Sequence, residues 1–217
     1  MQSTHPIPGD PWPHDMILAI EDDPHEAIEM LWVREAYALE VAGDVPPPLI
    51  DTPAPAARTL GETERARRQS AWPALWARVV AHAGRPTDSP AMDRLMRQDL
   101  PPEERAALLA EVTGPSWREE FGDGVFDDPS FHDARDRASD ARRSARPHSF
   151  ADIPERRDVE ALVPAWRQGL VRIVVIPCRG AYARSLGATG LLVTPGVRAD
   201  SSAYRVALAS FAPTAAS

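Results

Sequence analysis

The chain of 217 residues contains no lysine and no asparagine, so all 24 of its basic residues are arginine. Without lysine it can form neither a Walker-type phosphate loop, nor a kinase strand lysine, nor a Schiff base with pyridoxal phosphate or a carbonyl substrate. Without asparagine it has no Cys-His-Asn protease triad and no N-glycosylation site. Several large enzyme classes are therefore excluded, and the bias toward Ala, Arg, Pro and Gly indicates a GC-rich bacterial genome.

Cysteine is almost absent, since Cys178 is the only one. A single thiol cannot form an internal disulfide, a thiolate zinc cluster or a cysteine-ligated iron–sulfur centre, and this usage fits a reducing compartment. The first residues lack the basic and apolar regions of a signal peptide, and no run reaches the roughly 18 apolar residues of a membrane span. We expect a cytoplasmic protein with no membrane partner and no cofactor.

An excess of positive charge is also missing, because the formal net charge is -8 and the isoelectric point is near 5.3. This balance opposes non-specific attraction to nucleic acid. One group of arginines could override it locally, but its members alternate with aspartates and lack aromatic partners for base stacking. The group comprises Arg135, Arg137, Arg142, Arg143 and Arg146. The pattern predicts a solvated helix face, so nucleic acid is not an expected partner.

Helical spacing of apolar residues dominates the first two thirds of the chain. It predicts helices over residues 23–41, 62–83, 89–96, 101–114 and 128–146. Asp23 and Asp128, each followed by proline, are the predicted N-caps of the first and last of these. Along the last helix, alanines at intervals of three and four (Ala134, Ala138, Ala141 and Ala145) predict a seam at which another helix approaches closely. A proline-rich connector near residues 46–56 follows the first helix.

From Asp152 onward the pattern changes. A helix is predicted over residues 159–169, a buried strand over 170–176, and two further extended segments over 181–186 and 191–194. Residues 204–211 fit both helical and strand spacing, and Ser201 as a cap favours the helix. The fold class is therefore α+β, with a predominantly α-helical region at residues 1–150 and a small α+β unit at residues 151–217. One continuous domain is the alternative.

One segment has spacing typical of anion chemistry. The buried strand is followed by Cys178-Arg179-Gly180, and Arg184 and Ser185 stand six and seven places after the cysteine. This spacing resembles the phosphate loop of cysteine-dependent phosphatases, in the form found in low-molecular-weight phosphatases and arsenate reductases. The resemblance implies that Cys178 is a thiolate nucleophile, that Arg184 binds a small oxyanion and that Ser185 donates a hydrogen bond to the thiolate.

The same segment also has a structural interpretation. Residues 181–186 make a good hairpin strand, in which Arg184 faces solvent and Cys178 is a small buried residue. A strand points its N–H groups alternately to either side, so it would form no cradle for an anion. The two hypotheses therefore differ in whether the chain between Cys178 and Arg184 surrounds an anion or pairs in a sheet.

Carboxylates gather in a second segment, where Asp123, Asp127, Asp128 and His132 could ligate a hard divalent cation. Their spacing matches no calcium-loop pattern. Asp128 is better used as a helix cap and Asp123-Gly124 as a turn, so we favour the structural interpretation.

The function expected from these observations is that of an intracellular bacterial binding or accessory protein without catalytic activity. Another protein is the expected partner, with Trp12 and the run Pro46, Pro47 and Pro48 as interface anchors. Exposed tryptophan and preordered proline lose little entropy on binding. The alternative is the phosphatase-like or arsenate-reductase-like enzyme that uses Cys178 and Arg184, with a small oxyanion as its ligand.

Overall fold

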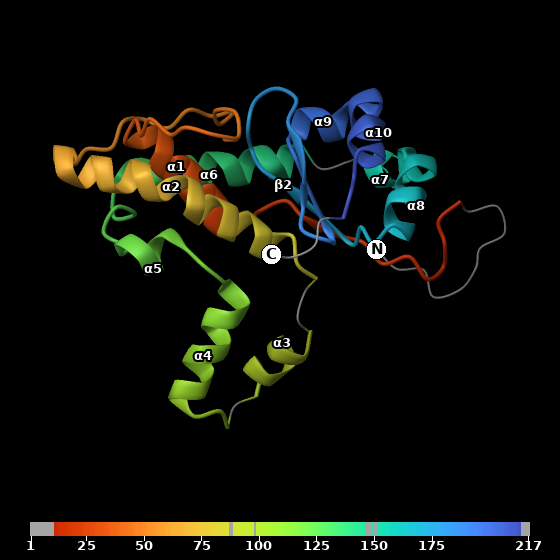
Figure 1. Ribbon diagram of the computed structural model, residues 1–217, viewed down its shortest axis with the longest axis horizontal. Helices are drawn as coiled ribbons and strands as arrows, with labels where there is room; N and C mark the ends of the chain where they lie inside the picture. Colours follow the sequence, from red (N-terminus) through yellow and green to blue (C-terminus); the bar gives the residue numbers. More distant parts are fainter. Residues whose placement is uncertain (1–10, 87–88, 98, 146–148, 150–151, 214–217) are drawn as a thin grey trace.

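The structure is a computed structural model with an α+β arrangement, and Figure 1 shows helices on either side of a small sheet. The residues it describes are 11–86, 89–97, 99–145, 149 and 152–213. Two predicted features lie outside these ranges: the boundary between the two regions of the chain, at residues 150 and 151, and the end of a helix at Arg146 and Pro147.

The sheet has four strands in the order β1-β2-β4-β3. They are β1 (Ala19–Glu21), β2 (Arg172–Val175), β3 (Ala183–Leu186) and β4 (Gly190–Val193). The first three in spatial order are parallel, with Ile20 opposite Ile173 and Val174 opposite Leu192, whereas β3 runs antiparallel to β4. The N-terminal region thus contributes an edge strand to a sheet built mainly from the C-terminal region.

Alternate residues of the buried strands point to opposite faces of the sheet, and each face has its own apolar core. Val174 and Leu192 pack into the larger core, which also contains aromatic side chains of four helices. These helices are α1 (His25–Ala36), α2 (Glu62–Ala83), α5 (Trp117–Phe121) and α6 (Pro129–Ser144). Trp72 and Trp76 of α2 stack at 5.2 Å between ring centroids within this core.

Ile173 and Leu191 point to the other face, where a second core forms. It is covered by α8 (Val159–Arg167), α9 (Pro195–Ala199) and α10 (Ser201–Ala209), with the short α7 (Pro154–Arg157) beside them. Glu155 is fully buried here. Its carboxylate accepts two hydrogen bonds of 2.8 Å from Arg198 and one of 2.8 Å from the Tyr204 hydroxyl.

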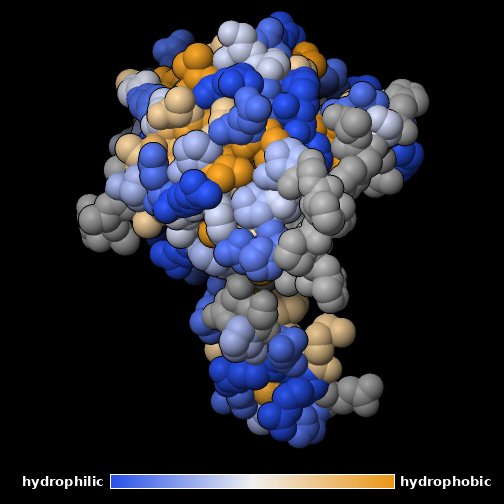
Figure 2. All heavy atoms as spheres, turned by 90° about the vertical axis from the view of Figure 1, so that its right-hand side faces the viewer, coloured by the Kyte–Doolittle hydropathy of each residue, from blue (hydrophilic) through white to orange (hydrophobic). Residues whose placement is uncertain are grey.

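Helices α3 (Ser89–Leu95) and α4 (Pro102–Thr113) form an arm that projects from the body (Figures 1 and 2). Its small core contains Ala91, Leu95 and Leu108. The arm joins the body where the His82 ring lies 3.0 Å from the Val112 carbonyl oxygen. Gly114 follows with a positive φ of 74°, and a Cβ there would lie 2.4 Å from the His82 ring, so the junction requires glycine.

The α+β class predicted from the sequence is confirmed, and most helices lie close to their predicted ranges. Pro73 lies inside α2 without ending it. Residues 201–209 form a helix, as favoured, but Asp200 rather than Ser201 is its cap, because the Asp200 carboxylate accepts from the Ala203 N–H at 2.8 Å.

Two predictions about the first helix are wrong. Its N-cap is Pro24, which makes no side-chain capping bond, and the Asp23 carboxylate instead pairs with Arg142 of α6 at 2.9 Å. The helix also ends at Ala36 rather than near residue 41, because Ala38 adopts a positive φ of 46° and turns the chain.

No described helix has both the length and the apolar composition needed to span a bilayer.

Candidate functional site

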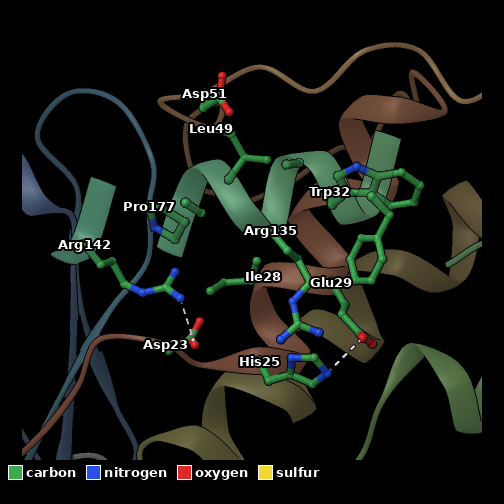
Figure 3. A pocket seen from close by; sticks show the side chains of 13 residues that line it. Asp23, His25, Ile28, Glu29, Trp32, Leu49, Asp51, Arg135, Arg142 and Pro177 are labelled. Atoms are coloured by element: carbon green, nitrogen blue, oxygen red, sulfur yellow. Dashed lines mark hydrogen bonds and ion pairs between the residues drawn. The ribbon is translucent and has the colours of Figure 1, made fainter. Parts of the chain in front are cut away.

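A pocket lies between α1 and α6, beside the carboxyl ends of the parallel strands β1 and β2 (Figure 3). The loop after β1 supplies Asp23. Pro177, two residues after the end of β2, closes one wall. The cavity has a volume of about 50 Å³, enough for a few water molecules or a small apolar group. Ligands of α/β proteins commonly bind at this edge of a sheet, outside the carboxyl ends of parallel strands.

The floor of the pocket is apolar because of the spacing of residues along two helices. Its apolar lining comprises Ile28 and Trp32 of α1, Phe131, Ala134 and Ala138 of α6, and Leu49 and Pro177. Trp32 and Phe131 meet edge to face, with 5.0 Å between ring centroids. Beyond Phe131, the apolar lining that α6 contributes is only Ala134 and Ala138, and the space that larger side chains would fill stays open.

The alanine spacing therefore has a different consequence from the close helix contact predicted from the sequence. Ala134 and Ala138 line the pocket, whereas Ala141 and Ala145 are exposed. The bulk of Trp32 and Phe131 sets the separation of α1 and α6, so the small side chains leave a cavity instead of a tight seam.

A buried carboxylate organises one wall. Glu29 is 1% exposed, and its oxygens accept hydrogen bonds from the Arg118 Nη2 at 2.6 Å and from the Arg118 Nε at 3.0 and 3.1 Å. The His25 Nε2 lies 3.0 Å from the same carboxylate, one helical turn away. Arg118 also lies over the Phe126 ring at 4.2 Å. The group ties α1 to α5 and holds the His25 ring at the edge of the pocket (Figure 3).

These contacts shift the pKa values of both titratable groups. The hydrogen bond to Glu29 raises the pKa of His25 above its ordinary value of 6.5, although burial and the charge of Arg135 act in the opposite direction. Burial alone would raise the pKa of Glu29, but the hydrogen bonds from His25 and Arg118 outweigh it and keep that pKa below its ordinary value. An ionised Glu29 beside a protonated His25 is therefore favoured at slightly acidic pH.

The remaining charges at the pocket mouth are mostly paired. Arg142 pairs with Asp23 at 2.9 Å, and Arg137 pairs with Asp51 at 2.6 Å. Arg135 differs: within the part of the chain that the structure describes it has no carboxylate partner, and its guanidinium lies 5.8 Å from the Phe131 ring centroid. Arg135 and His25 thus provide positive charge at the mouth (Figure 3).

The lining offers binding groups but few reactive ones. Among the described residues that surround the cavity there is no serine, threonine, cysteine or tyrosine. His25 has the carboxylate partner that a general base needs, yet no hydroxyl or thiol nucleophile stands beside it. The lining thus provides apolar contacts and charged groups with which a molecule could be held.

The phosphatase-like hypothesis required a loop around an anion between Cys178 and Arg184. Arg184 instead lies in β3, opposite Leu192 of β4, and pairs with Asp44 at 3.1 Å. The Ser185 hydroxyl accepts a hydrogen bond from the Ala212 N–H at 3.2 Å. The three residues therefore form no anion cradle, because strand pairing directs the backbone of β3 toward β4.

The thiol itself is placed differently from a nucleophile. Cys178 is 1% exposed and forms an antiparallel bridge with Leu49. Burial raises the pKa of the Cys178 thiol to about 12, even though the charge of Arg34 acts to lower it. Such a thiol stays protonated at neutral pH, as expected for a buried structural cysteine.

Of the predicted interface anchors, Trp12 and Pro46 are buried, Pro47 is half-buried and Pro48 is exposed. Trp12 is 4% exposed, packs in the second core and lies under the Arg156 guanidinium at 4.5 Å. Arg34 of α1 donates to the carbonyl oxygens of Pro46 and Pro47 at 2.7 and 2.9 Å, and the Arg179 N–H donates to Pro48 at 2.8 Å. The premise that Trp12 is exposed is wrong, and the prolines serve to hold the connector against the body.

The acidic segment serves to start and position α6. Asp128 caps the helix, as predicted, by accepting from the Ser130 N–H at 2.9 Å, and it also accepts from the Ala57 N–H at 2.7 Å. Asp123, Asp127 and His132 are exposed. Nowhere in the described ranges do three His, Cys, Asp or Glu side chains come together as metal ligands.

The sequence did not predict this pocket, although it marked Arg135 and Arg142 as part of a charged helix face and Ala134 and Ala138 as part of a helix seam. His25 and Glu29 stand four positions apart on a predicted helix, so their pairing was readable. Arg118 had no local signal, because it reaches Glu29 from an element distant in the chain.

Comparison with protein-family models, with curated proteins and with solved structures gives no match for this chain.

Proposed function

We propose that this chain is a non-catalytic binding protein that holds a small organic molecule in the pocket between α1 and α6. The observation that carries the proposal is the cavity itself: an apolar floor, one buried and paired carboxylate in its wall, charged groups at the mouth, and a position at the carboxyl ends of two parallel strands. Binding sites for small molecules typically combine these features.

The walls of the pocket support the proposal because ion pairs hold their carboxylates in place. Glu29 is fixed by Arg118, Asp23 by Arg142 and Asp51 by Arg137. Such contacts keep the lining in place when the pocket is empty, so little conformational entropy is lost when a ligand enters.

Other expectations from the sequence accompany this proposal. A buried, unreactive thiol fits a reducing cytoplasm, in a bacterium of GC-rich genome. A protein partner stays a prediction without an assigned surface, since Trp12 and Pro46 are buried and the Pro46–Pro48 carbonyl oxygens accept hydrogen bonds from the body. The phosphatase-like alternative receives no support from the placement of Cys178 and Arg184.

The proposal is tested with 3-methylbutanamide, a neutral molecule with a small branched tail, titrated into protein labelled with ¹³C at its alanine methyl groups. We expect the methyl resonances of Ala134 and Ala138 to shift first. Ala138→Leu adds three carbon atoms to the pocket wall and should abolish the shifts, whereas Ala141→Leu, on the exposed side of the same helix, should not. If no pocket methyl responds, or if Ala138→Leu leaves binding unchanged, the proposal is refuted.

A further inference from the structure

The charges around the pocket mouth also indicate the chemical class of the ligand. Three carboxylates near the mouth each have an arginine partner: Asp23 with Arg142, Asp51 with Arg137, and Glu29 with Arg118. Among the described residues that line the pocket, Arg135 is then the arginine without a carboxylate partner, and a protonated His25 adds a second positive group beside it. These two positive groups stand out on a chain whose net charge is -8.

Arg135 and His25 lie close enough to oppose each other. The hydrogen bond to Glu29 raises the pKa of His25, but the charge of Arg135 lowers it, which means that the two positive groups repel. Glu26, on the next position of α1, favours the protonated ring, so both neighbouring acids act together on His25. A negative group placed between Arg135 and His25 would relieve their repulsion and gain a charge-assisted hydrogen bond.

On these grounds we infer that the ligand is a small monoanion, a carboxylate with a short branched or aromatic tail, whose charged group lies between Arg135 and His25 and whose tail fills the apolar floor. The inference rests on the proposed function, because it assigns the ligand class of the same pocket. The tail and the charged group of this ligand match the two parts of the site. Ala134, Ala138 and Trp32 surround the tail, and the cations lie at the mouth.

The same charges disfavour other ligand classes. An amine would meet Arg135 and His25 directly and would have to break an existing ion pair to reach a carboxylate. A dianion such as phosphate would bring a second negative charge toward Asp23 and Asp51, whose arginine partners are already engaged. The enclosed volume of about 50 Å³ also limits the buried part of the tail to a few carbon atoms.

The test compares three molecules with the same tail: 3-methylbutanoate, 3-methylbutanamide and 3-methylbutylamine. Affinities are measured from the pocket methyl shifts at slightly acidic pH. We expect the carboxylate to bind at least about tenfold more tightly than the amide, as a charge-assisted interaction of 1.4 kcal/mol or more requires, and the amine to bind most weakly.

Variants of α6 separate the charge from the cavity. Arg135→Gln should weaken carboxylate binding several-fold toward that of the amide, with the remainder due to His25, and should leave amide affinity unchanged. Arg143→Gln is the matched control, since Arg143 is exposed on the same helix and pairs with Asp140 at 2.8 Å. Carboxylate binding should also weaken as the pH rises through the pKa of His25, while amide binding should not.

The outcomes distinguish the two claims. Equal affinity for carboxylate and amide, or carboxylate binding that survives Arg135→Gln, overturns the monoanion inference and leaves the pocket as a binding site. If none of the three molecules shifts the methyl groups of Ala134 and Ala138, both the inference and the proposed function are overturned.

Discussion

The buried carboxylate Glu29 makes the sharpest energetic prediction, because its charge is compensated by only two side chains. Replacing Arg118 with methionine removes the three contacts of 2.6 to 3.1 Å and leaves His25 as the single partner. Breaking a fully buried ion pair by removing one member costs about 3–5 kcal/mol. Arg118 is 39% exposed, so water can partly replace it, and we expect a loss of about 2–3 kcal/mol in the free energy of unfolding.

The effect of Arg118→Met should depend on pH in a defined direction. The pKa of His25 is raised, so its stabilising contribution is complete below 6.5 and is lost as the pH rises through the folded-state value. The pKa of Glu29 is lowered, so its contribution is present above 4.5 and is lost as the pH falls through the folded-state value. In the variant, raising the pH removes the last charged partner of Glu29, and the loss of stability should increase.

Urea unfolding followed by tryptophan fluorescence, at about pH 5.5 and about pH 8.5, measures both effects. The double variant Glu29→Leu/Arg118→Met is the control, since it leaves no uncompensated charge and should cost less than Arg118→Met alone. A loss below about 1 kcal/mol, typical of a surface pair, would refute the reasoning. So would a penalty that is the same at both pH values.

Three further predictions concern other parts of the molecule. Cys178 should resist alkylation by iodoacetamide in the folded protein, with or without phosphate, and react only on unfolding, because its thiol pKa is about 12; rapid native alkylation contradicts this. Tyr204→Phe should lower the free energy of unfolding by about 1–2 kcal/mol in denaturant titrations, since it deletes a buried hydrogen bond to a carboxylate that keeps its Arg198 contacts, and an unchanged midpoint would count against it. Leu108→Ala should abolish hydrogen-exchange protection in α3 and α4 but not in α1 or α2, because the arm has only a small core of its own; loss of protection throughout the body would show that the arm is not an independent unit.

Much of the secondary structure could be predicted because its signals are local. Asp128-Pro129 starts α6 with a side-chain cap, and the Trp72/Trp76 stripe of α2 faces the core as its spacing indicated. Strands β2 and β4 were recognisable from nearly continuous apolar runs, which are typical of strands covered on both faces. In each case a window of ten or so residues contains the necessary information.

The assembly of the sheet could not be predicted in the same way. Strand β1 is three residues long, and so short a segment has no measurable period from which its type could be predicted. Its partner β2 begins at Arg172, so the pairing depends on long-range packing. The consequence is that the N-terminal helices and the C-terminal sheet, which differ in pattern, share the larger core.

The pocket illustrates why a site can be missed when every element around it is found. Ala134 and Ala138 indicated a tight helix contact, and only the aromatic pair Trp32 and Phe131 decides that the space stays open. The volume of side chains on one helix decides whether small residues on the facing helix make a close contact or leave a cavity. No pattern within a single segment includes both helices.

The topology explains why a cavity forms at this place. Parallel pairing makes β1 and β2 end at the same edge, but the chain then diverges: after β1 it enters α1, and after β2 it turns at Pro177 to bridge Leu49. The backbone cannot fill the space between two diverging segments, so side chains of α6 close it instead. Because the fold creates the cavity and exposed side chains such as Arg135 surround its mouth, the ligand preference can be changed at position 135 without disturbing the core. A neutral or acidic residue there should shift the preference away from carboxylates while the stability of the protein stays the same.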